Sequence, residues 1–134
     1  MRYLFYLLML LVFASCKEKS AIGKQLSGSD SLVINFNEPG TINIAKTVST
    51  TEEKAIDKLA RFVDSKKGKE YKCGYDGNLM FYKNGQLQGD VSFNYSGEGC
   101  RHFILMLNNE LTSTAMGNEA ADFLKSLAEG KDWY

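Results

Sequence analysis

The chain has 134 residues, 44% of them hydrophobic and 24% charged, with 16 basic and 16 acidic side chains. This length and balance are typical of one globular domain and exclude a disordered chain. A net charge of zero offers no clustered positive surface for nucleic-acid phosphates and no polybasic patch for anionic lipids. We therefore expect no nucleic-acid partner, and any membrane attachment has to come from another feature.

Residues 1–15 have the layout of a secretory signal. Arg2 supplies a positive start, residues 3–14 form an unbroken apolar run, and the small residues Ala14 and Ser15 precede Cys16. The apolar run is well short of the about 20 residues that a membrane-spanning helix needs. The segment therefore indicates a cleaved signal peptide rather than a transmembrane anchor.

The four residues Phe13-Ala14-Ser15-Cys16 resemble the lipobox of bacterial lipoproteins, in which an aliphatic residue and two small residues precede the cysteine. Phe13 stands where Leu is usual in that family. The resemblance implies that the signal is removed before Cys16 and that acyl chains on Cys16 hold the protein to a membrane. The alternative is an ordinary signal peptide with a coincidental cysteine.

The resemblance also implies a location in the cell envelope of a Gram-negative bacterium. Lys17 follows Cys16, where an Asp would resemble a signal for retention in the inner membrane, so the outer membrane is favoured. The polar, small residues 17–31 predict a flexible tether with an r.m.s. span of roughly 20–23 Å. The expected organisation is a signal at 1–15, a lipidated Cys16 with its tether at 16–31, and one domain at 32–134.

Within that domain, alternating apolar residues predict strands at 32–36 and 41–49, the second with Ile42, Ile44 and Val48 on one side. Thr50 and Glu53 have the spacing of a capping box and predict a helix that buries Ile56, Leu59, Ala60 and Val63. Four strands are predicted at 70–75, 78–83, 86–95 and 100–108, with Asn84-Gly85 as a type I′ turn and a further short strand around 110–114 as an option. A last helix is predicted at 118–129.

This order, ββα-ββββ-α, predicts an α+β fold. We expect a mainly antiparallel sheet of about six strands, with two helices on one face. In an exported protein the two remaining cysteines, Cys73 and Cys100, predict a disulfide, which would stabilise the fold by about 3.5 kcal/mol. The alternative is two separate buried thiols.

A simple meander conflicts with that disulfide. It would place the two strands three positions apart, at about 14 Å, whereas a disulfide tolerates only about 4.4–6.8 Å between Cα atoms. The bond therefore requires a curled sheet, another strand order, or a position for Cys100 in a loop.

The search for catalytic residues is mostly negative. The single histidine, His102, lies mid-strand and is interpreted as structural, and without it no Ser-His-acid or Cys-His set can be built. The cysteines lack the C-x-x-C spacing of a redox or zinc motif. We predict no catalytic residues, no metal and no cofactor.

Aromatic residues follow three neighbouring strands: Tyr71, Tyr75, Phe81, Tyr82, Phe93 and Tyr95. They indicate either a binding surface or core and cross-strand packing. The resulting hypothesis is a non-enzymatic, lipid-anchored module that binds a protein, peptide or glycan through one sheet face or the turns near Cys73 and Cys100. The alternatives are a small envelope hydrolase that pairs Glu98 with Asp76 or Asp90, an inhibitor or immunity-type protein, and a purely structural envelope component.

Overall fold

A six-stranded antiparallel sheet organises the chain, and the computed structural model describes it for residues 18–69 and 72–133. The strands are β1 (Ser31–Asn37), β2 (Ile44–Thr50), β3 (Gly77–Lys83), β4 (Gln86–Asn94), β5 (His102–Leu107) and β6 (Glu110–Ala115). The helices are α2 (Ala21–Leu26), α3 (Glu53–Val63) and α4 (Asn118–Ala128). The predicted α+β class and the order ββα-ββββ-α are confirmed, with α2 as an additional helix.

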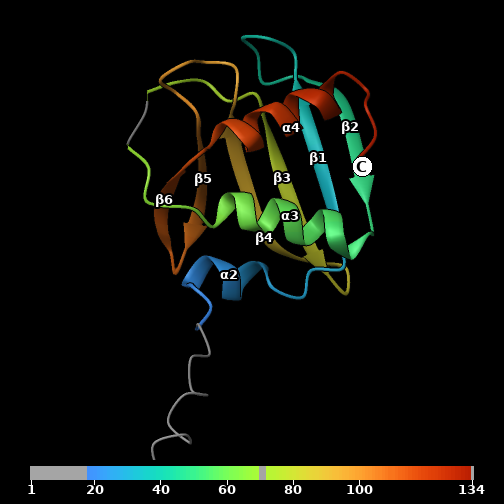
Figure 1. The fold of residues 1–134 in the computed structure, drawn as a ribbon, viewed down its shortest axis with the longest axis vertical. Coiled ribbons are helices and arrows are strands. Elements are labelled where there is room, and N and C mark those ends of the chain that lie inside the picture. Colours follow the sequence, from blue (N-terminus) through green and yellow to red (C-terminus); the bar gives the residue numbers. More distant parts are fainter. Residues whose placement is uncertain (1–17, 70–71, 134) are drawn as a thin grey trace, which may run out of the picture.

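The strand order in the sheet is β2-β1-β3-β4-β5-β6, so β1 lies between β2 and β3. After the β1–β2 hairpin the chain passes through α3 and re-enters the sheet on the other side of β1. The remaining strands then follow as a meander. Both α3 and α4 lie across one face of the sheet (Figure 1).

The core lies between that face and the two helices. Alternate residues of the central strands point into it, and each is at most 4% exposed: Leu32, Ile34, Phe36, Leu79, Phe81, Val91, Phe93, Phe103 and Leu105. The helices contribute the buried residues Ile56, Leu59, Val63, Ala120, Ala121, Leu124 and Leu127. Because strand side chains alternate between faces, the residues between these point away from the core.

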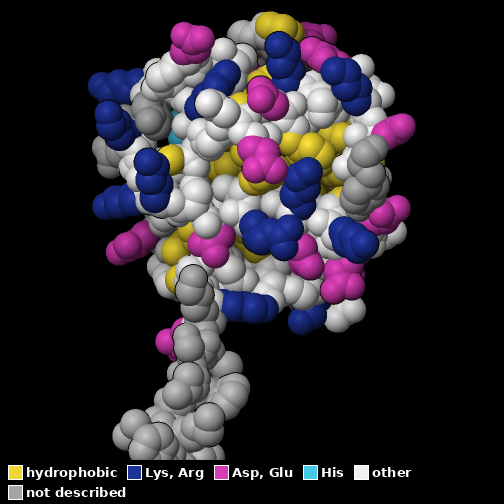
Figure 2. Space-filling view, in the orientation of Figure 1, with side chains coloured by type: hydrophobic (Ala, Val, Ile, Leu, Met, Phe, Trp, Pro, Cys, Tyr) yellow, Lys and Arg dark blue, Asp and Glu magenta, His cyan; other side chains and the backbone are white. Residues whose placement is uncertain are grey.

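The seam between α3 and α4 is filled by larger side chains that reach the surface. Phe123 packs against Phe62 and Trp133, with ring centroids 6.0 and 6.4 Å apart, and the Lys58 ammonium lies 4.2 Å from the Phe123 ring centre. Figure 2 shows these helices from outside, with an apolar band between them bordered by charged side chains. The helical layer is therefore apolar toward the sheet and charged toward water.

The predicted turn at Asn84-Gly85 is confirmed, since both residues have positive φ, 50° and 76°, as a type I′ turn requires. The β5–β6 turn uses Asn108 and Asn109 in the same way, with φ of 51° and 64°. This second turn creates β6, so the optional strand around 110–114 is present.

The strand predicted at 70–75 is wrong for residues 72–75, which form no regular structure, and residues 70–71 lie outside the described residues. Residues 66–69 instead run beside β6: the Gly68 amide donates to the Ser113 carbonyl, and the Ala115 amide to the Lys66 carbonyl, both at 2.9 Å. A six-strand sheet therefore arises with β6 in place of the predicted strand.

The tether predicted for residues 17–31 also differs from the structure, because residues 21–26 form α2. Ser20 caps this helix by accepting a hydrogen bond from the Gly23 amide at 3.0 Å. Ile22 and Leu26, four residues apart, share one side and are buried, Leu26 to 1% exposure. Two apolar residues in a polar segment are enough for one packed helical turn, which composition alone does not indicate.

Two further predictions are wrong, namely the residue that caps α3 and the side on which Ile42 and Ile44 lie. Thr50 ends β2, and its hydroxyl accepts from the Glu52 amide at 3.1 Å, so it does not cap the helix, which begins at Glu53. Ile42 and Ile44, predicted to lie on one side of the strand with Val48, are 93% and 57% exposed, and the β1–β2 turn projects beyond the helices (Figure 1). A register shift at the end of this hairpin, where Asn37 pairs with Ile44, turns Ile44 to the outer face, while Lys46 and Val48 lie on the inner side.

Candidate functional site

The sheet face opposite the helices carries a row of polar side chains across four strands. Thr47 of β2 donates to the Asn35 side-chain oxygen of β1 at 2.8 Å, and the Asn35 amide donates to Asn78 of β3 at 3.1 Å. The Asn78 amide donates in turn to the Asp90 carboxylate of β4 at 2.7 Å. This polar ladder, Thr47-Asn35-Asn78-Asp90, satisfies its members mutually, so each side chain is held in a defined position.

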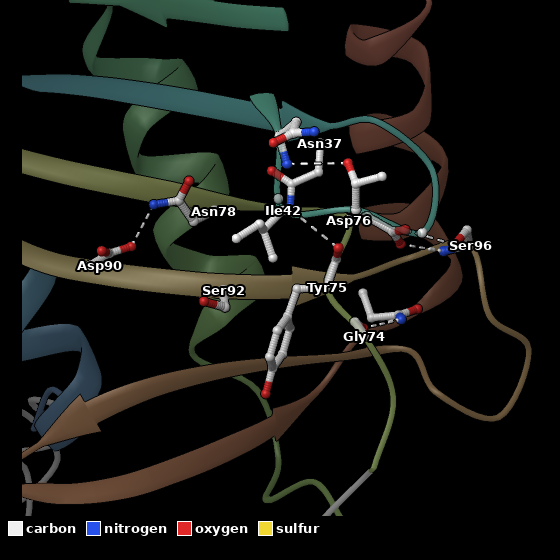
Figure 3. Close-up of a pocket in the computed structure, with 14 residues that line it drawn as sticks. Asn37, Ile42, Gly74, Tyr75, Asp76, Asn78, Asp90, Ser92 and Ser96 are labelled. Atoms are coloured by element: carbon white, nitrogen blue, oxygen red, sulfur yellow. Dashed lines mark hydrogen bonds between the residues drawn. The ribbon is translucent and has the colours of Figure 1, made fainter. Parts of the chain in front are cut away.

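The β3–β4 end of the ladder, Asn78 and Asp90, lines a hollow of about 850 Å³ (Figure 3). One wall is the β1–β2 turn, with Asn37, Gly40, Thr41, Ile42 and Asn43. The opposite wall is the segment that leads into β3, with Gly74, Tyr75, Asp76 and Gly77, and the residues between the two walls are Asn78, Asp90, Ser92, Asn94 and Ser96. Segments far apart in the sequence thus meet at one end of the open sheet face.

The lining of the hollow is rich in amides and hydroxyls. These groups both donate and accept hydrogen bonds, as sugar hydroxyls and peptide groups do. Tyr75 and Ile42 supply apolar surface on the rim, and no lysine or arginine is among the described residues that line it. The hollow therefore suits an uncharged polar ligand with an apolar side better than an anion.

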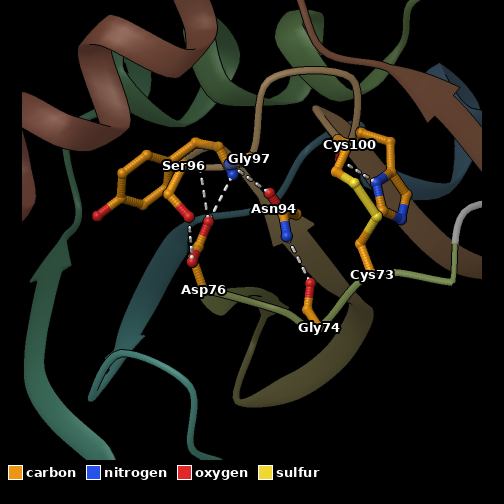
Figure 4. Close-up of a disulfide and its surroundings, with 9 residues drawn as sticks. Cys73, Gly74, Asp76, Asn94, Ser96, Gly97 and Cys100 are labelled. Carbon is orange, nitrogen blue, oxygen red and sulfur yellow. Dashed lines mark hydrogen bonds between the residues drawn. A yellow bond between two sulfur atoms is a disulfide. The ribbon is translucent and has the colours of Figure 1, made fainter.

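The Asp76 carboxylate is one of two in the hollow, and the neighbouring turn donates three hydrogen bonds to it. It accepts from the backbone amides of Tyr95 and Ser96 at 2.7 and 2.9 Å, and from the Ser96 hydroxyl at 2.8 Å (Figure 4). Burial, and then the negative charges of Asp76 and Glu129, raise the pKa of the Tyr95 phenol above its usual value. Asp76 is therefore a structural anchor for the β4–β5 loop.

A disulfide joins Cys73 to Cys100, with Cα atoms 6.2 Å apart, beside the same wall (Figure 4). Both cysteines lie in loops, which removes the conflict between a disulfide and strands three positions apart. Asn94 adds a second link across this region, because its amide donates to the Gly74 carbonyl at 2.6 Å and its oxygen accepts from the Gly97 amide at 3.1 Å. The segment that carries Tyr75 and Asp76 is thus fixed from both sides.

His102 lies at the start of β5 and is 1% exposed. Its Nδ1 atom lies 2.6 Å from the Cys100 carbonyl oxygen, and its ring centre lies 5.8 Å from that of Tyr75. The histidine therefore packs between the disulfide loop and the Tyr75 ring.

The structure brings two of the three candidate carboxylates, Asp76 and Asp90, to one hollow, while the exposed Glu98 is not among its lining residues. Cys16 lies outside the described residues. Sequence reasoning missed Asn35 and Asn78 of the ladder. Asn35 lies between the apolar Ile34 and Phe36, and Asn78 precedes Leu79, so strand alternation could have placed both on the outer face.

No helix within residues 18–69 and 72–133 is long and apolar enough to cross a membrane. The same part of the chain contains no group of three or more His, Cys, Asp or Glu side chains placed to hold a metal ion. Comparison with protein-family models, curated proteins and solved structures found no match to the chain.

Proposed function

We propose that the protein is a lipid-anchored, non-enzymatic binding module of the cell envelope that holds a neutral glycan in the hollow. The observation that carries this proposal is the polar ladder on an uncovered sheet face, which leads into a hollow lined by amides and hydroxyls. A buried core needs none of these groups, and their mutual hydrogen bonds keep them pre-organised for a ligand.

The chemistry of the lining favours a sugar over other ligands. Amide and hydroxyl groups match the mixed donors and acceptors of sugar hydroxyls, and the Tyr75 ring offers a flat surface for the apolar face of a sugar. Asp90 keeps a carboxylate oxygen beyond its bond to Asn78, and this oxygen can accept a hydroxyl hydrogen bond. An anionic ligand would meet two carboxylates and no cation among the described lining residues.

Binding of soluble neutral oligosaccharides tests the proposal, with acidic oligosaccharides as the comparison set. Tyr75→Ala removes the rim ring and should weaken neutral-glycan binding about tenfold or more, the equivalent of about 1.4 kcal/mol. Tyr82→Ala is the matched control, because Tyr82 lies on the same sheet face but does not line the hollow. Titration calorimetry that detects no neutral glycan, or an equal loss in both variants, would overturn the glycan assignment.

The anchor is part of the same proposal, and the lipobox-like residues 13–16 support it. Intact mass of the membrane-extracted protein should equal the chain from Cys16 onward with added acyl groups, and reduction should add the mass of two hydrogens for the Cys73–Cys100 bond. Cys16→Ser should release the protein from membranes. A Cys16→Ser protein that is processed and retained as the original is would exclude lipidation.

A second candidate, a small hydrolase, is favoured by one observation, the presence of Asp76 and Asp90 in one hollow. Glycoside hydrolysis uses two carboxylates, but Asp76 is already engaged by three hydrogen bonds from the β4–β5 loop. Incubation of a bound glycan followed by mass analysis separates the two functions. Cleavage that disappears in Asp90→Asn would establish the hydrolase and exclude the binding-only function.

A further inference from the structure

Three large apolar side chains are exposed on the open sheet face, at the end opposite to the hollow. Leu87, Met106 and Leu111 are 51%, 53% and 68% exposed. Met106 pairs with Leu111 across β5 and β6, and Leu87 pairs with Tyr82, which follows the buried Phe81 and so points away from the core. Cross-strand partners share a face, so all three lie on the same side of the sheet.

Helix α2 shows that the backbones carrying Leu87 and Met106 come near each other. The β4–β5 ladder pairs only residues 92–94 with 102–104, and below it the Gln25 amide donates to the carbonyls of Gln88 and Met106 at 3.1 and 3.2 Å. One amide group therefore spans the two strands where they separate. Leu87, beside Gln88, is thus close to Met106, and we call Leu87, Met106 and Leu111 the apolar patch.

The same helix brings the predicted lipidation site close to the patch. Ala21, the first residue of α2, is only five residues after Cys16. A fully extended chain spans at most about 3.6 Å per residue, so five residues allow at most about 18 Å between the lipidated residue and the start of α2. Figure 1 shows α2 below the β5–β6 turn, at the end of the molecule opposite the β1–β2 turn. Because Ile22 and Leu26 are buried, α2 moves with the domain.

We propose that the apolar patch rests in the headgroup region of the bilayer that holds the acyl chains of Cys16. This inference rests on the proposed lipid anchor and extends it from an attachment to an orientation. The domain contacts the lipid with its α2 end and the adjoining part of the open face, and its hollow lies toward the opposite end.

A lipid surface suits the patch better than a protein partner does. Three partly exposed side chains are far fewer than the about 20–30 residues that each partner of a specific protein interface contributes. Such a small apolar area is sufficient beside acyl chains, which already supply the membrane affinity, and its burial then only selects the orientation. Lys24 is exposed on α2 beside this end, where it can meet lipid phosphates.

The test uses the full acylated protein in vesicles of phosphatidylethanolamine and phosphatidylglycerol, with an environment-sensitive dye on a single introduced cysteine. Leu111→Cys places the dye in the patch. Ile42→Cys is the matched control, because Ile42 is also apolar and exposed but lies in the β1–β2 turn at the other end. We expect lipids with a headgroup quencher to quench the dye at position 111 several-fold more than the dye at position 42.

A second dye position tests the patch without labelling it. With the dye on Gln86→Cys, replacement of Met106 and Leu111 by serine should lower the quenching by about half or more, because the patch no longer favours the interface. Replacement of Ile42 and Ile44 by serine should leave it unchanged. All four side chains are exposed, so both double variants should keep the fold.

The outcomes separate this inference from the anchor. A protein without the added acyl mass overturns both. An acylated protein whose dyes at 111 and 42 are quenched equally overturns the membrane contact and leaves the anchor standing. If the environment of the dye at position 111 changed only when a membrane protein fraction was added, the patch would be assigned to a protein partner. That result would overturn its assignment to lipid.

Discussion

The two faces of the sheet are formed by the same strands but are stabilised by different interactions. On the helix-covered face, Phe81, Phe93 and Phe103 exclude water, and stability depends on filling the space between sheet and helices. On the open face, Asn35 and Asn78 are held by hydrogen bonds to each other, and hydrophobic burial requires neither. The covered face therefore carries the core, and the open face carries the polar ladder to which we assign the proposed recognition.

Adjacent residues make this contrast testable at one place in β3. Phe81 is fully buried, whereas Tyr82 points to the open face and is half-buried. Phe81→Ala should lower the free energy of unfolding by about 3–5 kcal/mol, because it removes a large core side chain and leaves a cavity. Tyr82→Ala should cost about 1 kcal/mol or less. Urea unfolding measures both, and similar losses would mean that the open face also carries the fold.

The disulfide should have the next largest effect, and it lies at the boundary of the hollow. Replacing both Cys73 and Cys100 by serine should lower the free energy of unfolding by about 3.5 kcal/mol, since it restores the entropy of the unfolded loop. Unlike Phe81→Ala, the double variant should also weaken ligand binding at a temperature where it is folded, because the wall with Tyr75 loses its covalent support. Denaturant unfolding together with calorimetry reports the two effects separately.

Much of the covered face could be predicted from the sequence, because a single period-2 pattern places residues such as Leu32, Ile34 and Phe36 together without knowledge of their partners. The strand predicted at 70–75 carried a similar pattern and is wrong for 72–75. Its backbone is held instead by the disulfide and by Asn94, contacts that depend on residues twenty or more positions away. Local alternation cannot distinguish these two cases.

The hollow could not be predicted for the same reason. Asn35 meets Asn78 only because β1 lies between β2 and β3, and this strand order depends on how α3 packs after the first hairpin. The sequence did indicate the region, since Asp76, Asp90 and the cysteine pair were all candidates. It could not establish that Asp76 is engaged by the β4–β5 loop, because hydrogen bonds of that kind follow from the folded loop.

Helix α2 shows how far the covered layer extends toward the N-terminus. Leu26→Ala should lower the free energy of unfolding by about 2–3 kcal/mol if α2 is part of the core, and by almost nothing if residues 17–31 act only as a tether. A Cβ on Gly89 would lie 2.6 Å from the Leu26 Cδ2 atom. Gly89→Ala should therefore be destabilising alone, and less so in combination with Leu26→Ala, which vacates the space.

The smallest expected effect is a pH dependence from Tyr95, which lies where the two faces meet. Its ring packs 5.9 Å from Phe93, and its amide donates to Asp76 beside the hollow. Burial and the nearby carboxylates of Asp76 and Glu129 raise its pKa above the usual 10. The unfolded chain then loses this proton at a lower pH than the folded protein does, so above about pH 10 the unfolded state binds fewer protons.

The free energy of unfolding should accordingly decline as the pH rises above about 10 through the folded pKa, and the contribution of Tyr95 should be fully present at lower pH. Tyr95→Phe keeps the ring but cannot ionise, so its stability should decline less over this range. Tyr82→Phe removes a phenol from the open face and serves as the control. Urea unfolding between about pH 8 and about pH 11 gives the free energy of unfolding as a function of pH for both proteins. If this free energy declined equally in Tyr95→Phe and the original protein, the raised pKa of Tyr95 would not be the cause of the decline.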